Sequence, residues 1–357
     1  MAISERENYL RTVKMGRDNA ESPEWIPCRV VISGASYNQL RDDVEEVMAQ
    51  HPVLFPGFEK GRRDYDNWDF GPAHRAGEYF EDAWGCIWRS DIDGIEGVVI
   101  NSLLAEWDDL ASYEAPDPVQ TGDRGPVDWE ANRRSIEGKR ARGELTSGGV
   151  PHGYLFMRMY YLRGFENLMY DFATQEPRLQ ELIDMLVAHN SRLIGQWLDI
   201  GVDKMEFGED LGTQTASVIS PKDFAQWITP AYRKLIKPCR EAGCLIALHS
   251  DGYIMELMDE FVKCGIDIIN PQDLCNGIDA LAREVKGRMC IRLDIDRQTV
   301  VPFGTAAEVR ELIAEEVRKL GSPQGGLELL CGIYPPTPAE NVEALCAAME
   351  EFRRYWW

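Results

Sequence analysis

The chain has 357 residues, of which 44% are hydrophobic, and its formal net charge is −22 at pH 7. That length and apolar content suffice for one large α/β domain with its own core. No apolar run approaches the roughly 20 residues that cross a bilayer. The strongly acidic balance argues against a nucleic acid or an anionic membrane surface as a partner.

The nine cysteines are irregularly spaced, and none forms a Cys-x-x-Cys motif. This pattern is typical of reduced thiols rather than of a disulfide framework. The first residues contain no apolar stretch of the kind that a signal peptide requires. We therefore expect a cytoplasmic protein.

The N-terminal half has few regular patterns. Residues 26–32 predict a first strand, whereas residues 50–80 show little periodicity. Residues 106–147 contain many polar, Pro, Gly and charged positions and predict a lid-like excursion. Residues 178–198 carry apolar side chains at helical spacing and predict a long helix.

The C-terminal half alternates between strand and helix patterns. Short apolar runs predict buried strands at residues 204–207, 244–248, 266–269, 289–293 and 327–330. Helix starts are indicated by Ser220-Pro221 and by capping boxes at Thr305 and Thr337. This alternation predicts a parallel sheet. We interpret residues 1–357 as a single (β/α)8 TIM-barrel domain with N-terminal insertions, whose site lies at the carboxyl ends of the strands.

Three potential metal ligands follow predicted strands. His249 and Asp251 come after the run 244–248, and Cys331 comes after the run 327–330. Parallel strands end at one face, so an imidazole, a carboxylate and a thiolate are expected to meet there. These are the three protein ligand types of zinc, and three ligands leave a fourth position for chemistry. Each residue also has a structural interpretation, such as a helix N-cap for Asp251 or a core thiol for Cys331.

Other candidate site residues lie at the same predicted face. Glu209 and Asp210 follow the run 204–207 and are candidates for a fourth ligand and a proton donor, in either order. Gln214 is expected to bind substrate. The residues expected to line an aromatic pocket are Tyr154, Met157 and Tyr334, and His152 is a weaker candidate for the site.

Several stretches together resemble the uroporphyrinogen decarboxylase superfamily over most of the chain. They are residues 82–88 (Asp-Ala-Trp-Gly-Cys-Ile-Trp), 162–167, 207–214, 249–251, 304–309 and 338–341, together with Cys331. Each stretch is a weak signal, and their order and spacing make the resemblance specific. The resemblance implies an (α/β)8 barrel, in agreement with the alternation of elements.

The superfamily contains two main chemistries. Its decarboxylases carry an N-terminal arginine-rich segment that binds porphyrinogen carboxylates, and residues 27–34 (Pro-Cys-Arg-Val-Val-Ile-Ser-Gly) lack it. Its cobalamin-dependent methyltransferases hold zinc with a His-x-Cys…Cys set. His249 and Cys331 match that set, whereas Asp251 stands at the position of the first Cys.

A carboxylate in place of a thiolate makes zinc a harder Lewis acid, which suits an oxygen substrate. The resemblance and this exchange predict demethylation of a methoxylated aromatic compound. The methyl group would pass to Co(I) of cobalamin on a separate corrinoid protein, and zinc would activate the ether oxygen.

Alternatives remain open at this point. A decarboxylase would need arginines in the barrel mouth, and Arg29, Arg158 and Arg292 are the candidates near predicted strands. Methyl transfer in the other direction, from a methyl-corrinoid to a thiol or folate, is a second alternative. A non-catalytic binding protein on a degenerate barrel is a third. The sequence does not determine whether the chain forms a homodimer.

Overall fold

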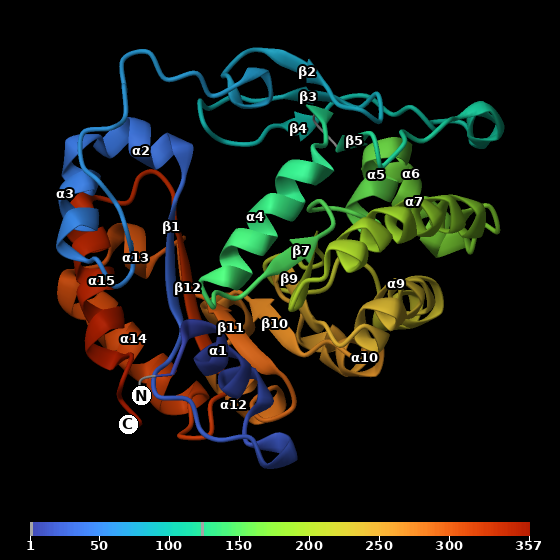
Figure 1. Cartoon of the computed structure of the whole chain (residues 1–357). Helices are drawn as coiled ribbons and strands as arrows, with labels where there is room; N and C mark the ends of the chain where they lie inside the picture. Colours follow the sequence, from blue (N-terminus) through green and yellow to red (C-terminus); the bar gives the residue numbers. More distant parts are fainter. Residues whose placement is uncertain (1–2, 123–124) are drawn as a thin grey trace.

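Seven parallel strands form the central sheet of the computed structural model, which describes residues 3–122 and 125–357. Their order is β1-β12-β11-β10-β9-β8-β7, and the sheet curls into a barrel-like α/β fold (Figure 1). The predicted fold class is confirmed. Within the described residues, however, the sheet has seven strands rather than eight, and β1 and β7 are its two edges.

All five strand predictions in the C-terminal half are confirmed. The strands of the sheet are β1 (Cys28–Ile32), β7 (Ser147–Gly149), β8 (Lys204–Asp210), β9 (Leu245–Asp251), β10 (Ile268–Pro271), β11 (Cys290–Asp294) and β12 (Leu327–Ile333). Several run past their apolar segments. As a result Asp210, His249 and Asp251 lie among the last residues of β8 and β9, where Asp210 pairs in register with Asp251.

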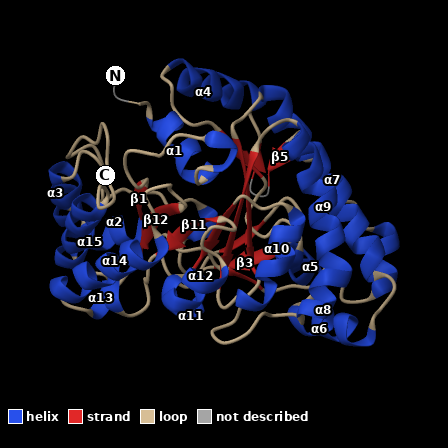
Figure 2. Cartoon of the chain, turned by 90° about the horizontal axis from the view of Figure 1, so that it is seen from below, coloured by secondary structure: helices blue, strands red, loops and turns tan. Residues whose placement is uncertain are grey.

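Helices cover the outside of the sheet (Figure 2). Those that follow strands in the C-terminal half or precede them are α7 (Leu179–Ile200), α9 (Thr229–Glu241), α10 (Met258–Cys264), α12 (Ile278–Glu284), α14 (Ala306–Leu320) and α15 (Ala339–Phe352). The capping box at Thr305 is confirmed, because its hydroxyl and the Glu308 carboxylate exchange bonds with each other's backbone. The box predicted at Thr337 is wrong, since α15 begins after Pro338 without a side-chain cap.

Helix α1 (Glu5–Lys14) is bound to strands β11 and β12 by a buried polar network. The hydroxyl of Tyr9 donates to Glu328 at 2.9 Å, and Arg292 donates to the same hydroxyl at 2.9 Å. Arg292 also pairs with Glu328 at 2.8 Å and with Glu206 at 3.0 Å. Every charge in this network has a partner of opposite sign, which buried charges require.

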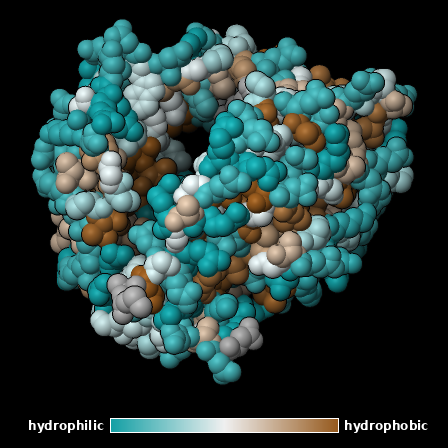
Figure 3. Space-filling view, viewed as in Figure 1, coloured by the Kyte–Doolittle hydropathy of each residue, from teal (hydrophilic) through white to brown (hydrophobic). Residues whose placement is uncertain are grey.

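A small antiparallel sheet lies across the upper end of the barrel in Figure 1. It consists of β2 (Tyr79–Glu81), β3 (Ile87–Arg89) and β4 (Val98–Val99). The predicted excursion follows it as η3 (Trp107–Ser112), β5 (Thr121–Gly122), β6 (Gly125–Pro126) and α4 (Trp129–Ala141). The surface is hollowed between α2 (Gly34–Leu40) and α4 (Figure 3). Among the described helices, none has both the length and the apolar character that a bilayer crossing needs.

Glu316 of α14 is a buried acid that makes stability depend on pH. Burial, followed by the charge of Asp273, raises the pKa of Glu316 well above its usual range. A carboxyl group whose pKa is higher in the folded than in the unfolded state stabilises the fold while it is protonated in both states, below about pH 4.3. This contribution to stability is lost as the pH rises and the unfolded state ionises first. We therefore expect Glu316→Gln to unfold at a higher temperature than the parent chain at pH 8 and to approach it at pH 5. The expected gain in free energy of unfolding is therefore largest at pH 8 and shrinks as the pH is lowered.

Thermal unfolding followed by circular dichroism at the two pH values measures this difference. Glu311→Gln, on an exposed position of the same helix, is the matched control. If both variants shift equally with pH, the burial of Glu316 is not the cause.

Candidate functional site

His249 is oriented by a neighbouring strand. Its Nδ1 lies 2.9 Å from Oδ1 of Asn270 on β10, while the Asn270 amide donates to the carbonyl of Arg292 at 2.6 Å. The amide oxygen therefore faces the imidazole, and Nδ1 donates to it. This leaves the Nε2 lone pair directed toward carboxylates, 3.4 Å from Asp251 and 3.9 Å from Asp210. An imidazole fixed in this way is typical of metal-binding histidines.

A second imidazole completes a donor group around Asp210. His152 follows β7, and its Nε2 lies 3.3 Å from Oδ1 of Asp210. Its ring centroid is 5.6 Å from that of His249. The potential ligand atoms of His152, Asp210 and His249 all lie within 4.8 Å of one another. Two imidazoles and a carboxylate are a known zinc ligand set, so these residues fit the ion that the sequence predicted.

The imidazole of His152 and the carboxylate of Asp210 shift each other's pKa. Burial by itself lowers the pKa of His152, but its hydrogen bond to Asp210 and the charge of that carboxylate raise it overall. Burial would raise the pKa of Asp210, and the hydrogen bond and charge of His152 lower it below its usual value. Both shifts favour the charged imidazolium–carboxylate pair, and a metal ion bound to these two groups would compete with the proton on the imidazole.

His249 also belongs to a second donor group. Its ligand atom and those of Asp251 and Asp294 lie within 4.8 Å of one another. Here a cation is already in place: Nη2 of Arg297 lies 2.5 Å from Asp251 and 3.2 Å from Asp294. The guanidinium group also lies over the ring of Tyr334, 5.3 Å from its centroid. Tyr334 thus contacts Arg297 rather than lining the aromatic cavity described below.

Cys331 lies outside both donor groups of the described residues. Its side chain is fully buried on β12, with Sγ 3.8 Å from the carbonyl oxygens of Ile295 and Gly332. Burial, followed by the charge of Asp294, raises the pKa of the thiol well above its usual value. The structure therefore places His249 beside Asp251, and it places Cys331 outside the two donor groups that contain His249.

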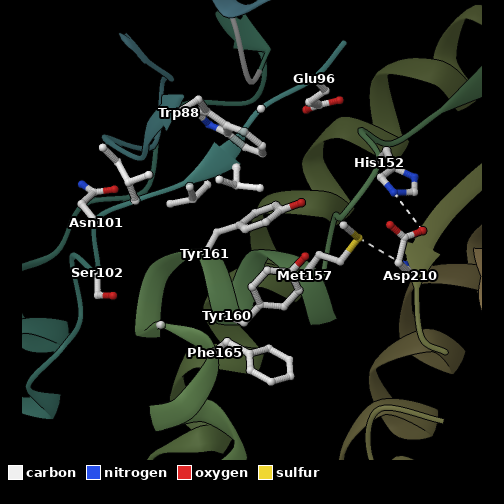
Figure 4. A pocket seen from close by; sticks show the side chains of 15 residues that line it. Trp88, Glu96, Asn101, Ser102, His152, Met157, Tyr160, Tyr161, Phe165 and Asp210 are labelled. Carbon is white, nitrogen blue, oxygen red and sulfur yellow. Dashed lines mark hydrogen bonds and ion pairs between the residues drawn. The ribbon is translucent and has the colours of Figure 1, made fainter. Parts of the chain in front are cut away.

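A cavity of about 510 Å³ opens beside His152 and Asp210 (Figure 4). We call it the aromatic cavity, because its walls carry Trp88, Tyr160, Tyr161 and Phe165. One wall is β3, β4 and the segment after them, and the other is α5 (Phe156–Arg163), which also contributes Met157 as predicted. The predicted excursion 106–147 contributes none of the described lining residues.

Glu209 supports this wall instead of facing the cavity. It is fully buried, and its carboxylate accepts the backbone N–H groups of Leu155, Phe156 and Met157 at 2.7, 2.8 and 3.0 Å. A carboxylate at a helix start is stabilised by the unpaired N–H groups there. Burial nevertheless raises the pKa of Glu209 to about 7. These bonds fix the start of α5, and the catalytic role expected for Glu209 stays a prediction.

Two other predicted substrate residues lie elsewhere. Tyr154 is buried in the core, with its ring centroid 5.4 Å from Phe207 and 5.6 Å from Tyr232. Gln214 is exposed and borders a smaller cavity of about 220 Å³, which also contains Asp294 and Arg297. Neither residue lines the aromatic cavity. For Tyr154 the reason is its packing against Phe207 and Tyr232, which are distant in the sequence.

The arginines that a decarboxylase would need are already paired or lie at the surface. Arg158 is buried and pairs with Asp82 at 3.0 Å. Arg292 is held by Glu206 and Glu328 in the network below the site. Arg29 is exposed on β1. These three side chains therefore do not form a carboxylate-binding cluster at the barrel mouth.

Comparison with known proteins identifies the family. A family model described as "Uroporphyrinogen decarboxylase (URO-D)" matches residues 85–352. The chain belongs to this family. Curated URO-D relatives include the uroporphyrinogen decarboxylases of Prochlorococcus marinus (strain NATL2A), 25% identical over 183 residues and 49% of each chain, and of Solibacter usitatus, 25% identical over 274 residues and 72% of each chain. The chain spans about half the length of the first of these relatives.

A solved structure shares the fold of this URO-D family member across nearly its whole length. It is a methyltransferase from Methanosarcina mazei, with a TM-score of 0.65 and 16% identity. The match covers 97% of this chain and 98% of that one. At this identity the likeness shows the fold alone, and the activity must be argued from the site.

Proposed function

We propose that the protein is a zinc-dependent methyltransferase that demethylates a methoxylated aromatic compound. The methyl group would pass to Co(I) of cobalamin carried by a separate corrinoid protein, which supplies the nucleophile. The observation that carries this proposal is the aromatic cavity, which opens directly onto His152 and Asp210 of the imidazole–carboxylate group. An aryl ether bound there has its ring against aromatic walls and its oxygen near metal ligands.

His249, Asp210 and His152 are the ligands that we propose for zinc. This group borders the cavity, whereas Asp251 is paired with Arg297. When bound, zinc supplies a Lewis acid that lowers the basicity of the leaving phenoxide. Asn270 fixes the ring of His249 so that Nε2 faces the site. Cys331, the third ligand predicted by the sequence, is kept as an alternative that spectroscopy can test.

The other residues of the site bind and orient the substrate. Trp88 and Tyr161 form adjacent walls, with ring centroids 4.9 Å apart in an edge-to-face arrangement. Met157 lies between these rings and Asp210, since its Sδ is 3.1 Å from the Asp210 backbone nitrogen. Glu209 holds the helix that carries Met157 and Tyr161. These contacts favour a flat apolar ring whose substituent points toward the donor group.

The proposal is tested with purified protein and free cob(I)alamin as methyl acceptor. We expect about one zinc per chain by elemental analysis, and zinc-dependent conversion of methoxyarenes to phenols with formation of methylcobalamin. Full activity after complete chelation would contradict the proposal. Turnover of a porphyrinogen by metal-free protein would support a decarboxylase instead. Assays that start from methylcobalamin with a thiol or folate acceptor test transfer in the other direction.

A further inference from the structure

We infer that Arg297 determines where the divalent ion binds, because its guanidinium group closes one of the two donor groups that share His249. The inference rests on the proposed function for the identity of the ion. Its own claim is that a fixed cation excludes a metal ion from Asp251 and Asp294 and thereby keeps the ion beside the aromatic cavity.

His249 can serve only one of the two donor groups at a time. Its Nδ1 is engaged by the neighbouring strand β10, so Nε2 is the nitrogen whose lone pair faces the carboxylates. One lone pair binds one ion. The first group adds His152 and Asp210 to this nitrogen, whereas the second group adds Asp251 and Asp294. An ion bound by His249 therefore has to be in one group or the other.

The two donor groups border different cavities. His152 and Asp210 line the aromatic cavity of about 510 Å³. Asp294 and Arg297 line the smaller cavity of about 220 Å³, whose other described walls are mostly polar and include Gln272. The choice between the groups therefore decides whether the ion faces an aromatic or a polar ligand.

The oxygen of Asp251 that faces His249 is already bonded to Arg297. This oxygen, Oδ1, lies 3.4 Å from Nε2 of His249 and 2.5 Å from Nη2 of Arg297. The same Nη2 lies 3.2 Å from Oδ2 of Asp294. A zinc ion in this group would need these carboxylate oxygens at about 2.0–2.2 Å, where the guanidinium group now donates. One cation thus occupies both carboxylates of the second group.

A guanidinium group is harder for a metal ion to displace than a proton. Arginine stays charged in proteins, so metal binding cannot release a proton from it as it can from an imidazole. In the first group the partner of Asp210 is the imidazole of His152, at 3.3 Å. A divalent ion a few ångströms from the guanidinium group of Arg297 is repelled by it, which lowers its affinity at least about 100-fold.

Arg297 is held in this position by its side chain and by its turn. Its guanidinium group lies over the ring of Tyr334, 5.3 Å from the centroid, which favours a cation there. The preceding residue, Asp296, accepts the backbone nitrogen and the hydroxyl of Thr299 at 2.9 and 2.8 Å. The backbone nitrogen of Asp296 donates to Asp273 at 2.9 Å. The turn that carries Arg297 is therefore fixed on both sides.

Removing the guanidinium group should move the ion to the second donor group. Arg297→Met leaves two carboxylates beside His249 there, against one in the first group, so a divalent ion is attracted to them more strongly. X-ray absorption spectroscopy of the zinc-loaded chain counts the imidazole ligands. We expect two imidazoles per zinc in the parent chain and one in Arg297→Met.

Arg297→Lys is the matched control, because it keeps a cation at the same position. It should retain two imidazole ligands, as in the parent chain. One imidazole ligand in the parent chain, or two in Arg297→Met, would overturn the inference. A change to one imidazole in Arg297→Lys would also overturn it, because a positive charge alone would then not exclude the ion.

Zinc affinity provides a second test that misfolding cannot imitate, because it predicts a reversal rather than a loss. Competition with a chelator of known affinity measures it. In the parent chain, His152→Ala should weaken zinc binding at least about 100-fold and Asp294→Asn less than about tenfold. In the Arg297→Met background we expect the opposite order of the two effects. The same order in both backgrounds would contradict the inference.

These measurements separate the inference from the proposed function. A parent chain without zinc, together with an Arg297→Met variant that binds zinc through one imidazole, would refute the proposed function and leave the exclusion by Arg297 standing. Zinc-dependent demethylation by a parent chain whose ion has one imidazole ligand would refute the inference and leave the proposed function standing. If neither chain binds zinc, both claims fail.

Discussion

His249→Ala is expected to lose zinc and, with it, demethylation of methoxyarenes. His249 is the member that both donor groups share, so no intact group of three remains among the described residues when its imidazole is removed. Loss of partners that only orient a metal ligand typically reduces affinity about 10- to 100-fold, and loss of the ligand itself should exceed that range. Zinc content after dialysis against a chelator of known affinity measures the loss. Asn270→Ala should give the smaller, 10- to 100-fold reduction, because it removes the bond at Nδ1 and keeps the ligand.

Substitution of cobalt for zinc decides between the two ligand sets, which are His249, Asp210 and His152 or His249, Asp251 and Cys331. With Co²⁺ in place of zinc, a thiolate ligand produces an intense sulfur-to-metal charge-transfer absorption that imidazole and carboxylate ligands lack. We expect no such band in the parent chain, and we expect Cys331→Ser to retain zinc. Cys346→Ser, which removes another buried thiol on α15, is the matched control. A charge-transfer band that disappears in Cys331→Ser and persists in Cys346→Ser would restore the set His249, Asp251 and Cys331.

Short-range patterns were sufficient to predict the fold class and most of the sheet. The apolar runs before Asp210, His249 and Cys331 each became a buried parallel strand, because burial on both faces leaves a signal in consecutive residues. The number of strands was not predictable in the same way. The segment between β1 and β7 builds a separate small sheet over the barrel, and nothing in its local composition distinguishes that sheet from a further barrel strand.

Site residues could be predicted where the strand end alone determines their place. His249, Asp251 and Asp210 follow that rule. Cys331 and Glu209 also follow predicted apolar runs, but their partners cannot be identified from the sequence. The thiol of Cys331 contacts the carbonyl of Ile295, and the carboxylate of Glu209 binds the start of α5. Arg297 was missed although it lies only three residues after Asp294, the last residue of β11. Its proximity to that strand end was the available signal, and His152 had a similar one after β7.

Asp82→Ala is expected to produce the largest loss of stability of any substitution near the cavity. The Asp82 carboxylate is buried and accepts four bonds: from the backbone nitrogens of Trp84 and Cys86, each at 2.9 Å, from Nε1 of Trp88 at 2.9 Å, and from Arg158 at 3.0 Å. Removing one partner of a buried ion pair typically costs about 3–5 kcal/mol. Denaturant unfolding measures this loss, and weaker binding of an uncharged methoxyarene such as 3-methoxybenzamide should accompany it, because Trp88 loses its hydrogen bond to Asp82.

A double variant distinguishes the ion pair from simple loss of packing. Arg158→Met in the Asp82→Ala background removes the buried charge that has lost its Asp82 partner and keeps an apolar side chain in its place, so it should recover part of the lost free energy of unfolding. The exposed pair of Arg310 and Glu351 provides the scale for a surface interaction, and Glu351→Ala should cost much less free energy of unfolding than Asp82→Ala. If Asp82→Ala costs no more than Glu351→Ala, the carboxylate does not anchor this wall. The orientation of Trp88, and with it the shape of the aromatic cavity, would then not depend on this carboxylate.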